Sequence, residues 1–436
     1  MSKLGALFSF DGHHTTAGRE VIAGLTTFTT MSYIVVVNPA ILSAAGIPEG
    51  PSFVATVLVA VFGCYFMAFY ANRPFAIAPY MGENAFIAFT VCKVLGFSWQ
   101  TALAAIFIAG AAFVIMTVLH LRQWIVDGVP TVLRYSFAVG IGLFLTFIGL
   151  NETGLVKLGT PGAPVQAGNL TSHPALVAMF GFILIAVLVV RKVPGAILLG
   201  IVVTALVAFV AHVAAPPAGV VSLPPSIAPI VWQLDFRGAF TWRAFPIVLT
   251  IFIMAFVDTM GTLIGLSARA GFLDKKGQLP QIERPMLVDA VTTCVAPALG
   301  TTTAGAYVES ATGIEAGGRT GFTVLVTGTC FLLTLIFSPF VAAIPPQAFG
   351  PALIIVGLFM LAPIAHIDFA NYTESIPAFA VVVLMAFTFN IAIGICAGFV
   401  LYPVCKLVAG KRAELKPGLW ALTALSLLFF VFYPYH

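Results

Sequence analysis

Long hydrophobic runs fill most of the chain, and short polar stretches separate them. The first runs predict helices at about 21–43, 53–71, 76–91, 98–121, 131–151, 174–190 and 194–214. A second set follows at about 244–266, 286–300, 305–316, 320–342, 350–365, 376–389 and 390–409. A helix needs roughly 20 apolar residues to cross a bilayer and a barrel strand only about 10, so the runs indicate a helical membrane protein. A last run, about 418–434, could span once more or lie along the surface.

The fourteen runs form two groups of seven, separated by a proline-rich loop near 215–243. If the N-terminus is cytoplasmic, 16 of the 20 Lys and Arg residues lie inside and 4 lie outside, namely Lys93, Lys157, Arg237 and Arg243. This excess agrees with the positive-inside rule. Because seven is an odd number, the second group is inverted relative to the first, which is typical of secondary transporters.

The composition supports a membrane protein and narrows its chemistry. Hydrophobic residues make up 60% of the chain, charged residues only 8%, and the mean hydropathy is +1.06, whereas soluble domains carry roughly 25% charge. The six cysteines lie in or beside apolar runs and form no Cys-x-x-Cys pair, so we expect neither a disulfide framework nor a metal site. The sequence contains no phosphate-binding loop and no nucleophile elbow, so we expect neither an enzyme nor an ATP-driven pump.

The third run of each group is short and interrupted. Pro74, Pro79 and Gly82 precede an acidic residue in the first group, and the stretch 300–305 (Gly-Thr-Thr-Thr-Ala-Gly) precedes another in the second. Proline and glycine break helices. We therefore predict an extended stretch in each, leading into a half-helix that starts near the middle of the membrane. Irregular backbone at that depth lines a cavity or is covered by protein.

Three acidic residues lie within apolar surroundings. Glu83 and Glu309 occupy matching places in the two groups (309 − 83 = 226), and Asp258 lies deep in the eighth run. A charged residue at the centre of a membrane helix costs about 2.5–3.5 kcal/mol on insertion scales, so these acids predict a functional site. We interpret Glu309 as a substrate ligand, with capping of its own half-helix as the alternative. We interpret Asp258 as a proton-coupling group, with a structural hydrogen bond as the alternative.

Several neighbours complete the predicted site. Asn84 could bind substrate or cap a helix, Gly82 could let the backbone approach a ligand or another helix, and Glu83 could contact substrate or pair within the core. The predicted substrate-binding set is Gly82, Glu83, Asn84, Phe256, Asp258, Tyr307, Glu309 and Ser310, with the aromatic rings covering the substrate.

Two further patterns predict packing rather than chemistry. Gly261 and Gly265 form Gly-x-x-x-Gly, which is typical of close helix packing. Glu315 and Arg319 have the spacing of an i, i+4 ion pair.

Four stretches, in order along the chain, resemble the azaguanine-resistance-type purine permeases of the nucleobase–cation symporter-2 (xanthine/uracil permease) family. They are residues 26–42, 81–86 (Met-Gly-Glu-Asn-Ala-Phe), 258–262 (Asp-Thr-Met-Gly-Thr) and 307–321. The resemblance implies an all-helical fold of fourteen segments in two inverted sevens, with segments 3 and 10 part strand and part helix. It also implies a core domain (1–121 and 244–342) and a gate domain (122–243 and 343–409), followed here by a C-terminal extension (410–436).

The resemblance further implies proton-coupled uptake of hypoxanthine, guanine or adenine across the plasma membrane, which is the inner membrane in a bacterium. It implies no cofactor beyond the coupling proton, and it allows a homodimer. By position, Glu309 and Asp258 become the acids of the substrate and proton site, and Gly82 and Asn84 the third-segment contacts. Many members have an apolar residue where this chain has Glu83, which leaves the preferred substrate and the role of Glu83 open. A same-fold transporter of xanthine, uracil or a small anion is the alternative, and an ion channel is a more distant one.

Overall fold

The computed structural model describes residues 6–119, 128–160, 163–217, 219–274 and 279–432. Some sequence predictions lie outside these residues: the domain boundary at 121 and 122, residues 433–434 of the last apolar run, and the cytoplasmic charges Lys3, Arg122, Lys275 and Lys276.

The first group of apolar runs forms helices close to the predicted ranges. They are α2 (Ala17–Met31) with α3 (Ile34–Ser43), α4 (Glu49–Phe66) with its π-helical end (Met67–Ala71), α5 (Met81–Ala85) with a π-helical continuation (Phe86–Val94), α6 (Trp99–Val118), α8 (Thr131–Glu152), α9 (His173–Val190) and α10 (Ala196–Val210). The short helix α11 (Phe236–Ala239) lies in the loop between the groups.

The second group repeats this order. It comprises α12 (Phe245–Ala270), α13 (Glu283–Leu299), α14 (Ser310–Glu315), α15 (Gly321–Thr334) with α16 (Ser338–Ala342), α17 (Pro346–Met360), α18 (Tyr372–Phe387) and α19 (Ile391–Val408). The last apolar run forms α20 (Pro417–Phe432). Among the described residues, nine helical stretches are long and apolar enough to cross a membrane, and α10, α18 and α20 are shorter apolar helices.

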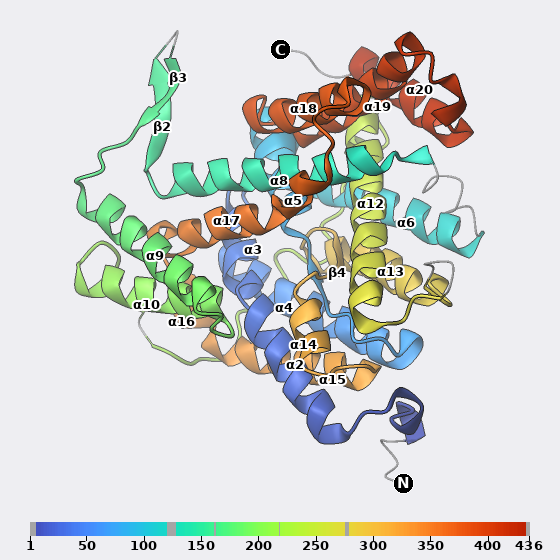
Figure 1. Ribbon diagram of the computed structural model, residues 1–436. Coiled ribbons are helices and arrows are strands. Elements are labelled where there is room, and N and C mark those ends of the chain that lie inside the picture. The colour runs from blue at the N-terminus through green and yellow to red at the C-terminus, as the bar shows by residue number, and fades with distance from the viewer. Residues whose placement is uncertain (1–5, 120–127, 161–162, 218, 275–278, 433–436) are drawn as a thin grey trace.

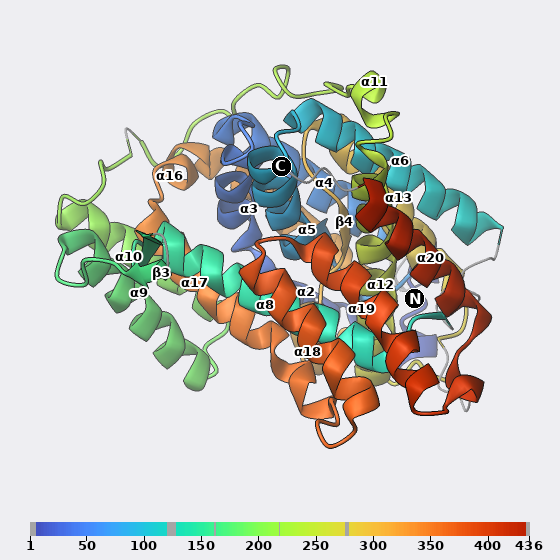
Figure 2. The same cartoon turned by 90° about the horizontal axis from the view of Figure 1, so that it is seen from above.

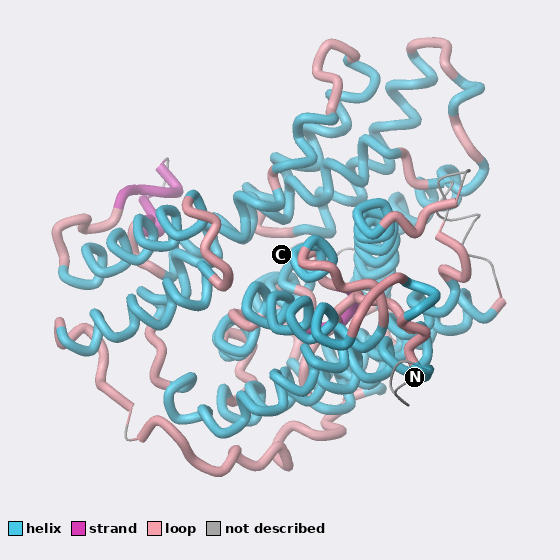
Figure 3. The backbone as a smooth tube through the Cα atoms, turned by 60° about the horizontal axis from the view of Figure 1, so that its bottom comes forward, coloured by secondary structure: helices cyan, strands magenta, loops and turns pink. Residues whose placement is uncertain are grey.

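The third and tenth segments are extended before they become helical, as predicted. Strand β1 (Ile77–Pro79) pairs antiparallel with β4 (Ala304–Ala306) near the middle of the helical assembly (Figures 1 and 3). The pairing continues past both strands, since the Tyr80 N–H donates to the Thr303 carbonyl and the Tyr307 N–H to the Ala76 carbonyl, each at 2.9 Å. The two segments thus satisfy each other's backbone groups where lipid offers no partner.

A β-hairpin, β2 (Val156–Thr160) with β3 (Ala163–Ala167), projects from the far end of α8 (Figure 1). It lies in the loop that the sequence places outside.

The helices pack in two neighbouring sets. Helix α8 packs on α17 and α18, and α9 packs on α10 and α17, whereas α13 packs on α6 and α4, and α15 on α2 and α4. Figure 2 shows α8, α17, α18 and α19 as a slanting layer beside the helices of the other set. Helix α5 contacts both α3 and α8, so the broken third segment lies where the two sets meet.

One buried carboxylate joins the two halves of the chain. Glu20 of α2 is fully buried and accepts hydrogen bonds from the Arg319 N–H at 2.9 Å, the Thr320 hydroxyl at 2.8 Å and the Thr323 hydroxyl at 2.5 Å. These donors lie at the start of α15, so Glu20 supplies acceptors to a helix N-terminus from another helix.

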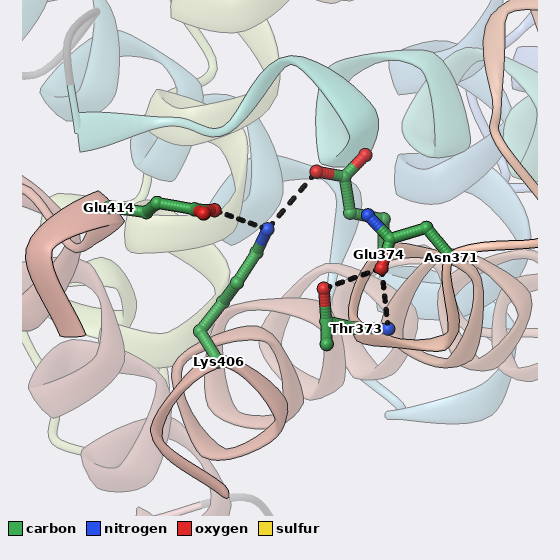
Figure 4. Close-up of polar contacts among 5 residues, drawn as sticks. All are labelled: Asn371, Thr373, Glu374, Lys406 and Glu414. Carbon is green, nitrogen blue, oxygen red and sulfur yellow. Dashed lines mark hydrogen bonds and ion pairs between the residues drawn. The ribbon is translucent and has the colours of Figure 1, made fainter. Parts of the chain in front are cut away.

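A charged cluster fixes the connection to α20. The Lys406 ammonium of α19 lies 3.1 Å from a Glu374 carboxylate oxygen of α18 and 2.6 Å from one of Glu414 (Figure 4). The same figure shows Asn371 capping the start of α18 by accepting from the Thr373 N–H and hydroxyl. The hydrogen bond from Lys406 lowers the pKa of Glu414 from its ordinary value of 4.5.

Candidate functional site

Two tyrosines anchor the crossing of the broken segments. The rings of Tyr80 and Tyr307 lie parallel, with centroids 6.4 Å apart. The Tyr307 hydroxyl donates to the Pro79 carbonyl, and the Tyr80 hydroxyl lies 3.2 Å from the Thr259 hydroxyl of α12. The strand pair is therefore held in a fixed position against α12.

Asp289 of α13 also forms hydrogen bonds to the crossing of the two broken segments. One of its oxygens accepts from the Ala306 N–H at 3.1 Å and from the Tyr80 hydroxyl at 3.4 Å. Its neighbour Thr293 donates to the Ala304 carbonyl at 2.9 Å. Both side chains thus bind the tenth segment to the ninth.

Glu309 precedes α14 directly and is partly exposed. Its carboxylate accepts a hydrogen bond of 2.7 Å from the hydroxyl of Tyr33, a residue only 1% exposed between α2 and α3. The described contacts include no capping bond from this carboxylate to α14. Sequence reasoning missed Tyr33, and the only signal for it was a hydroxyl-bearing ring within an apolar run.

The structure brings the three predicted acids together. Asp258 lies midway along α12 and is partly exposed, and its carboxyl group is close enough to Glu309 for their charges to interact. Glu83 on α5 is likewise within electrostatic reach of Asp258. Helix α12 packs against both α5 and α14. Segments 3, 8 and 10 therefore each contribute one carboxyl group to the same region.

The face of α12 that carries Asp258 is not covered by protein at Gly261 and Gly265. A Cβ atom placed on Gly261 or Gly265 meets nothing within 4 Å, and both glycines are exposed. The prediction that this Gly-x-x-x-Gly pair packs against another helix is therefore wrong. Glu309, directly before the neighbouring α14, and Thr312 within it are partly exposed, as is Asp258. The two acids therefore share an accessible side of α12 and α14.

The predicted i, i+4 ion pair of Glu315 with Arg319 is also wrong. Glu315 instead pairs with Arg269 of α12 at 2.7 Å, and both side chains are more than half exposed. The chain turns at Gly317, where φ is 109°, and this ends α14 before Arg319. An i, i+4 ion pair needs a continuous helix, so Glu315 and Arg319 do not pair. The Arg319 guanidinium instead donates to the Ile314 carbonyl at 2.6 Å.

Four other predicted residues are engaged by protein neighbours. The Asn84 amide donates to Asn38 and accepts from Thr302, and the Ser310 hydroxyl accepts from the Ala76 N–H at 2.9 Å. The side chains of Asn84 and Ser310 are fully buried, so they stabilise the crossing.

Gly82 and Phe256 meet neighbouring helices. A Cβ atom on Gly82 would collide with Ile141 of α8, so the glycine permits close approach of α5 and α8. The Phe256 ring lies 5.7 Å from that of Phe113 on α6. Residues two positions apart in an α-helix lie about 200° apart around its axis, so Phe256 points away from the side of Asp258.

Within the described ranges, no three His, Cys, Asp or Glu side chains are grouped to hold a metal ion. A cavity of about 120 Å³ lies between α3, α4, α16 and α17 and is lined by Glu49 and Glu152, and its lining includes none of the three acids.

Comparison with known proteins decides the class. The chain matches the model of a permease family (Xan_ur_permease) over residues 18–400. The chain belongs to this permease family. The permease is 44% identical over 425 residues to permease MJ0326 of Methanocaldococcus jannaschii, with 98% of this chain and 97% of that protein covered.

Two relatives have more specific names. Adenine permease AdeP of Escherichia coli is 39% identical to the permease, with 99% of this chain and 97% of AdeP covered. Guanine/hypoxanthine permease PbuG of Bacillus subtilis is 37% identical, with 98% and 99% covered.

Solved structures confirm the fold. The transmembrane domain of BicA, a cyanobacterium bicarbonate transporter, superposes with a TM-score of 0.62 at 16% identity, covering 87% of this chain and 97% of that one. The murine anion transporter Slc26a9 gives a TM-score of 0.64 at 11% identity, covering 90% and 68%. At such identities the likeness shows the fold alone, two inverted groups of seven segments. The permease is a multi-pass membrane transporter and not an enzyme.

Proposed function

We propose that this permease takes up purine nucleobases (adenine, guanine or hypoxanthine) together with protons, across the plasma membrane and with its N-terminus cytoplasmic. The observation that carries the proposal is the approach of Asp258 and Glu309, from segments 8 and 10, on an accessible side of α12 and α14. The names of relatives such as AdeP and PbuG support the purine class.

Glu309 is the proposed substrate acceptor. Purine bases carry N–H donors on the ring, and adenine and guanine also carry an amino group. A carboxylate only accepts hydrogen bonds and has two oxygens for them. One Glu309 oxygen is oriented by Tyr33, which leaves the other for the base edge.

Asp258 is the proposed proton carrier. Two carboxylates whose charges interact repel each other in a site of low dielectric, and this repulsion is relieved when one binds a proton. A proton on Asp258 therefore favours a charged Glu309, which is the form that accepts hydrogen bonds from the base. This preference couples the proton to the substrate.

Transport requires the site to face each side in turn. We assign residues 1–121 and 244–342 to a moving core and residues 122–243 and 343–409 to a gate. The close approach of Gly82 to Ile141 is a contact between them. A bound proton shifts the equilibrium only if its affinity differs between the outward and inward forms.

A small anion is the rival substrate, because bicarbonate and anion transporters share the fold. Among the described residues, no basic side chain has an electrostatic interaction with Glu83, Asp258 or Glu309 that shifts its charge state. An anion placed beside uncompensated acids would be repelled, so the acids favour a neutral base with N–H donors.

The test uses the purified permease in lipid vesicles. We expect uptake of labelled hypoxanthine to rise with an inward proton gradient and to be competed by adenine and guanine more than by xanthine, uracil or bicarbonate. Glu309→Gln and Asp258→Asn should each abolish uptake, and the exposed loop variant Asp368→Asn should not. Uptake indifferent to the gradient would remove the coupling, and near-normal transport by either site variant would overturn the role of that residue.

A further inference from the structure

Glu83 is the buried acid that the proposed function leaves without a task. It lies in α5, its side chain is only 2% exposed, and its Oε1 has no hydrogen-bond partner among the described residues. Buried polar atoms almost always have a partner. An isolated charge is far more costly to bury than a neutral carboxylic acid, so this environment favours a bound proton.

Among the described charged side chains, Asp258 of α12 interacts electrostatically with Glu83. Helix α5, which carries Glu83, packs against α12. The Tyr80 hydroxyl lies 3.2 Å from that of Thr259, which follows Asp258 directly. This contact fixes the residues just before α5 against the turn of α12 that carries Asp258.

The other polar groups around Glu83 carry no charge or form hydrogen bonds with other partners. The hydroxyl of Tyr307 donates to Pro79, and that of Tyr80 is occupied by Thr259 and Asp289. Helix α3 presents the amide of Asn38, which is bonded to Asn84, and α8 presents the apolar Ile141. Glu309, directly before α14, interacts electrostatically with Asp258.

We propose that Glu83 and Asp258 form one proton-binding pair, in which a single proton is shared between the two carboxyl groups. One group keeps its O–H bond and donates it to an oxygen of the other, so the pair carries one negative charge. If both groups were ionised, the buried charge of Glu83 would lie near that of Asp258, and its Oε1 would have no donor among the described residues. Two carboxyl groups that share a site commonly divide a proton in this way, and their titration then belongs to the pair.

This proposal rests on the proposed function and refines it. The pair carries the coupling proton, which comes from water on one side and returns to water on the other, and no other bond is made or broken. Glu309, with its own donor in Tyr33, stays free to accept hydrogen bonds from the base. The three predicted acids thus divide into a proton pair and a substrate acceptor, while Asp289, which also interacts with Asp258, stays bound to the Ala306 N–H and the Tyr80 hydroxyl.

The first experiment needs no transport. Infrared difference spectra of the purified permease across a pH titration should contain the carbonyl band of a protonated carboxylic acid. We expect Glu83→Gln and Asp258→Asn each to remove or shift this band and Asp368→Asn to leave it unchanged. A band unaltered by Glu83→Gln overturns the pair, whether or not the protein transports purines.

The second experiment measures hypoxanthine uptake and binding against pH. Removing one acid of a pair weakens proton binding by the other, so Glu83→Gln should move half-maximal uptake to lower pH by about one unit or more. Base affinity at acid pH should stay within about threefold. Glu83→Asp, which keeps a carboxyl group, should restore most of the shift and serves as the measured variant if Glu83→Gln does not fold. An unshifted profile with weakened base binding would make Glu83 a substrate ligand instead.

Discussion

Removal of one hydroxyl, in Tyr33→Phe, tests how strongly the substrate acceptor depends on its orientation. The ring is 1% exposed and keeps its packing when only the oxygen is lost. The lost group donates to Glu309 at 2.7 Å, a short hydrogen bond to a carboxylate. Tyr33 contacts Glu309 rather than the proposed substrate position, so it acts as a positioning residue.

The size of the effect follows from this bond. Hydrogen bonds to charged groups contribute about 1.5–3 kcal/mol. If the bond orients Glu309 for the base, its loss weakens purine binding by about that amount, which corresponds to about 10- to 150-fold in the dissociation constant at 1.4 kcal/mol per tenfold. Protein stability should fall by less, because Glu309 is partly exposed and water can replace the donor.

The assay is equilibrium binding of labelled hypoxanthine to the purified permease. Tyr65→Phe is a matched control, because it removes a hydroxyl 3.0 Å from that of Thr329 on an exposed side of the protein. We expect Tyr65→Phe to bind like the parent and Tyr33→Phe to bind at least tenfold more weakly, with a smaller loss of thermal stability. A dissociation constant within twofold of the parent would refute the reasoning that Tyr33 prepares Glu309.

Three other substitutions follow from the structure. Glu20→Ala should lower the free energy of unfolding by about 3–5 kcal/mol, measured in detergent, because several donors at the start of α15 lose their acceptor, and an unchanged stability would contradict this. Gly82→Val should slow uptake by its collision with Ile141, and Ile141→Ala in the same chain should restore it if the core–gate contact is the cause. The lowered pKa of Glu414 means that its bond to Lys406 contributes stability above about pH 4.5 that is lost as the pH falls through the lowered value. Amide exchange in α20 should therefore rise at acid pH, and in Lys406→Met it should already be raised at neutral pH.

The broken segments were predictable because they break local rules. Pro74 and Pro79 disfavour a helix interior, Gly82 weakens one, and the Thr-rich stretch 300–305 favours extended backbone. Their pairing as β1 and β4 follows from the absence of other backbone partners at that depth. The three acids were predictable for a related reason, since burying a charge in an apolar run is costly without a use.

The contacts that orient the acids were not predictable. Tyr33 reaches Glu309 across 276 residues, and Glu20 reaches Thr323 across 303. Hydrophobic periodicity gives the buried face of each helix but not the depth at which two distant helices meet. The same limit explains Gly261 and Gly265, whose spacing fits helix packing equally well whether or not a helix lies opposite.

Glu83 and Glu309 show how the two inverted repeats place acids in different surroundings. They are 226 residues apart, whereas the β1–β4 register relates residues 227 apart, so Glu83 corresponds to Ser310 and Glu309 to Gly82. Their surroundings differ, because Glu309 is partly exposed and receives the Tyr33 hydroxyl, whereas Glu83 is buried beside Asp258 with an oxygen that no described donor reaches. A donor favours the charged form of a carboxyl group and burial without one favours the protonated form. Under our proposal the asymmetry therefore makes one acid a ligand for the base and the other a holder of the proton.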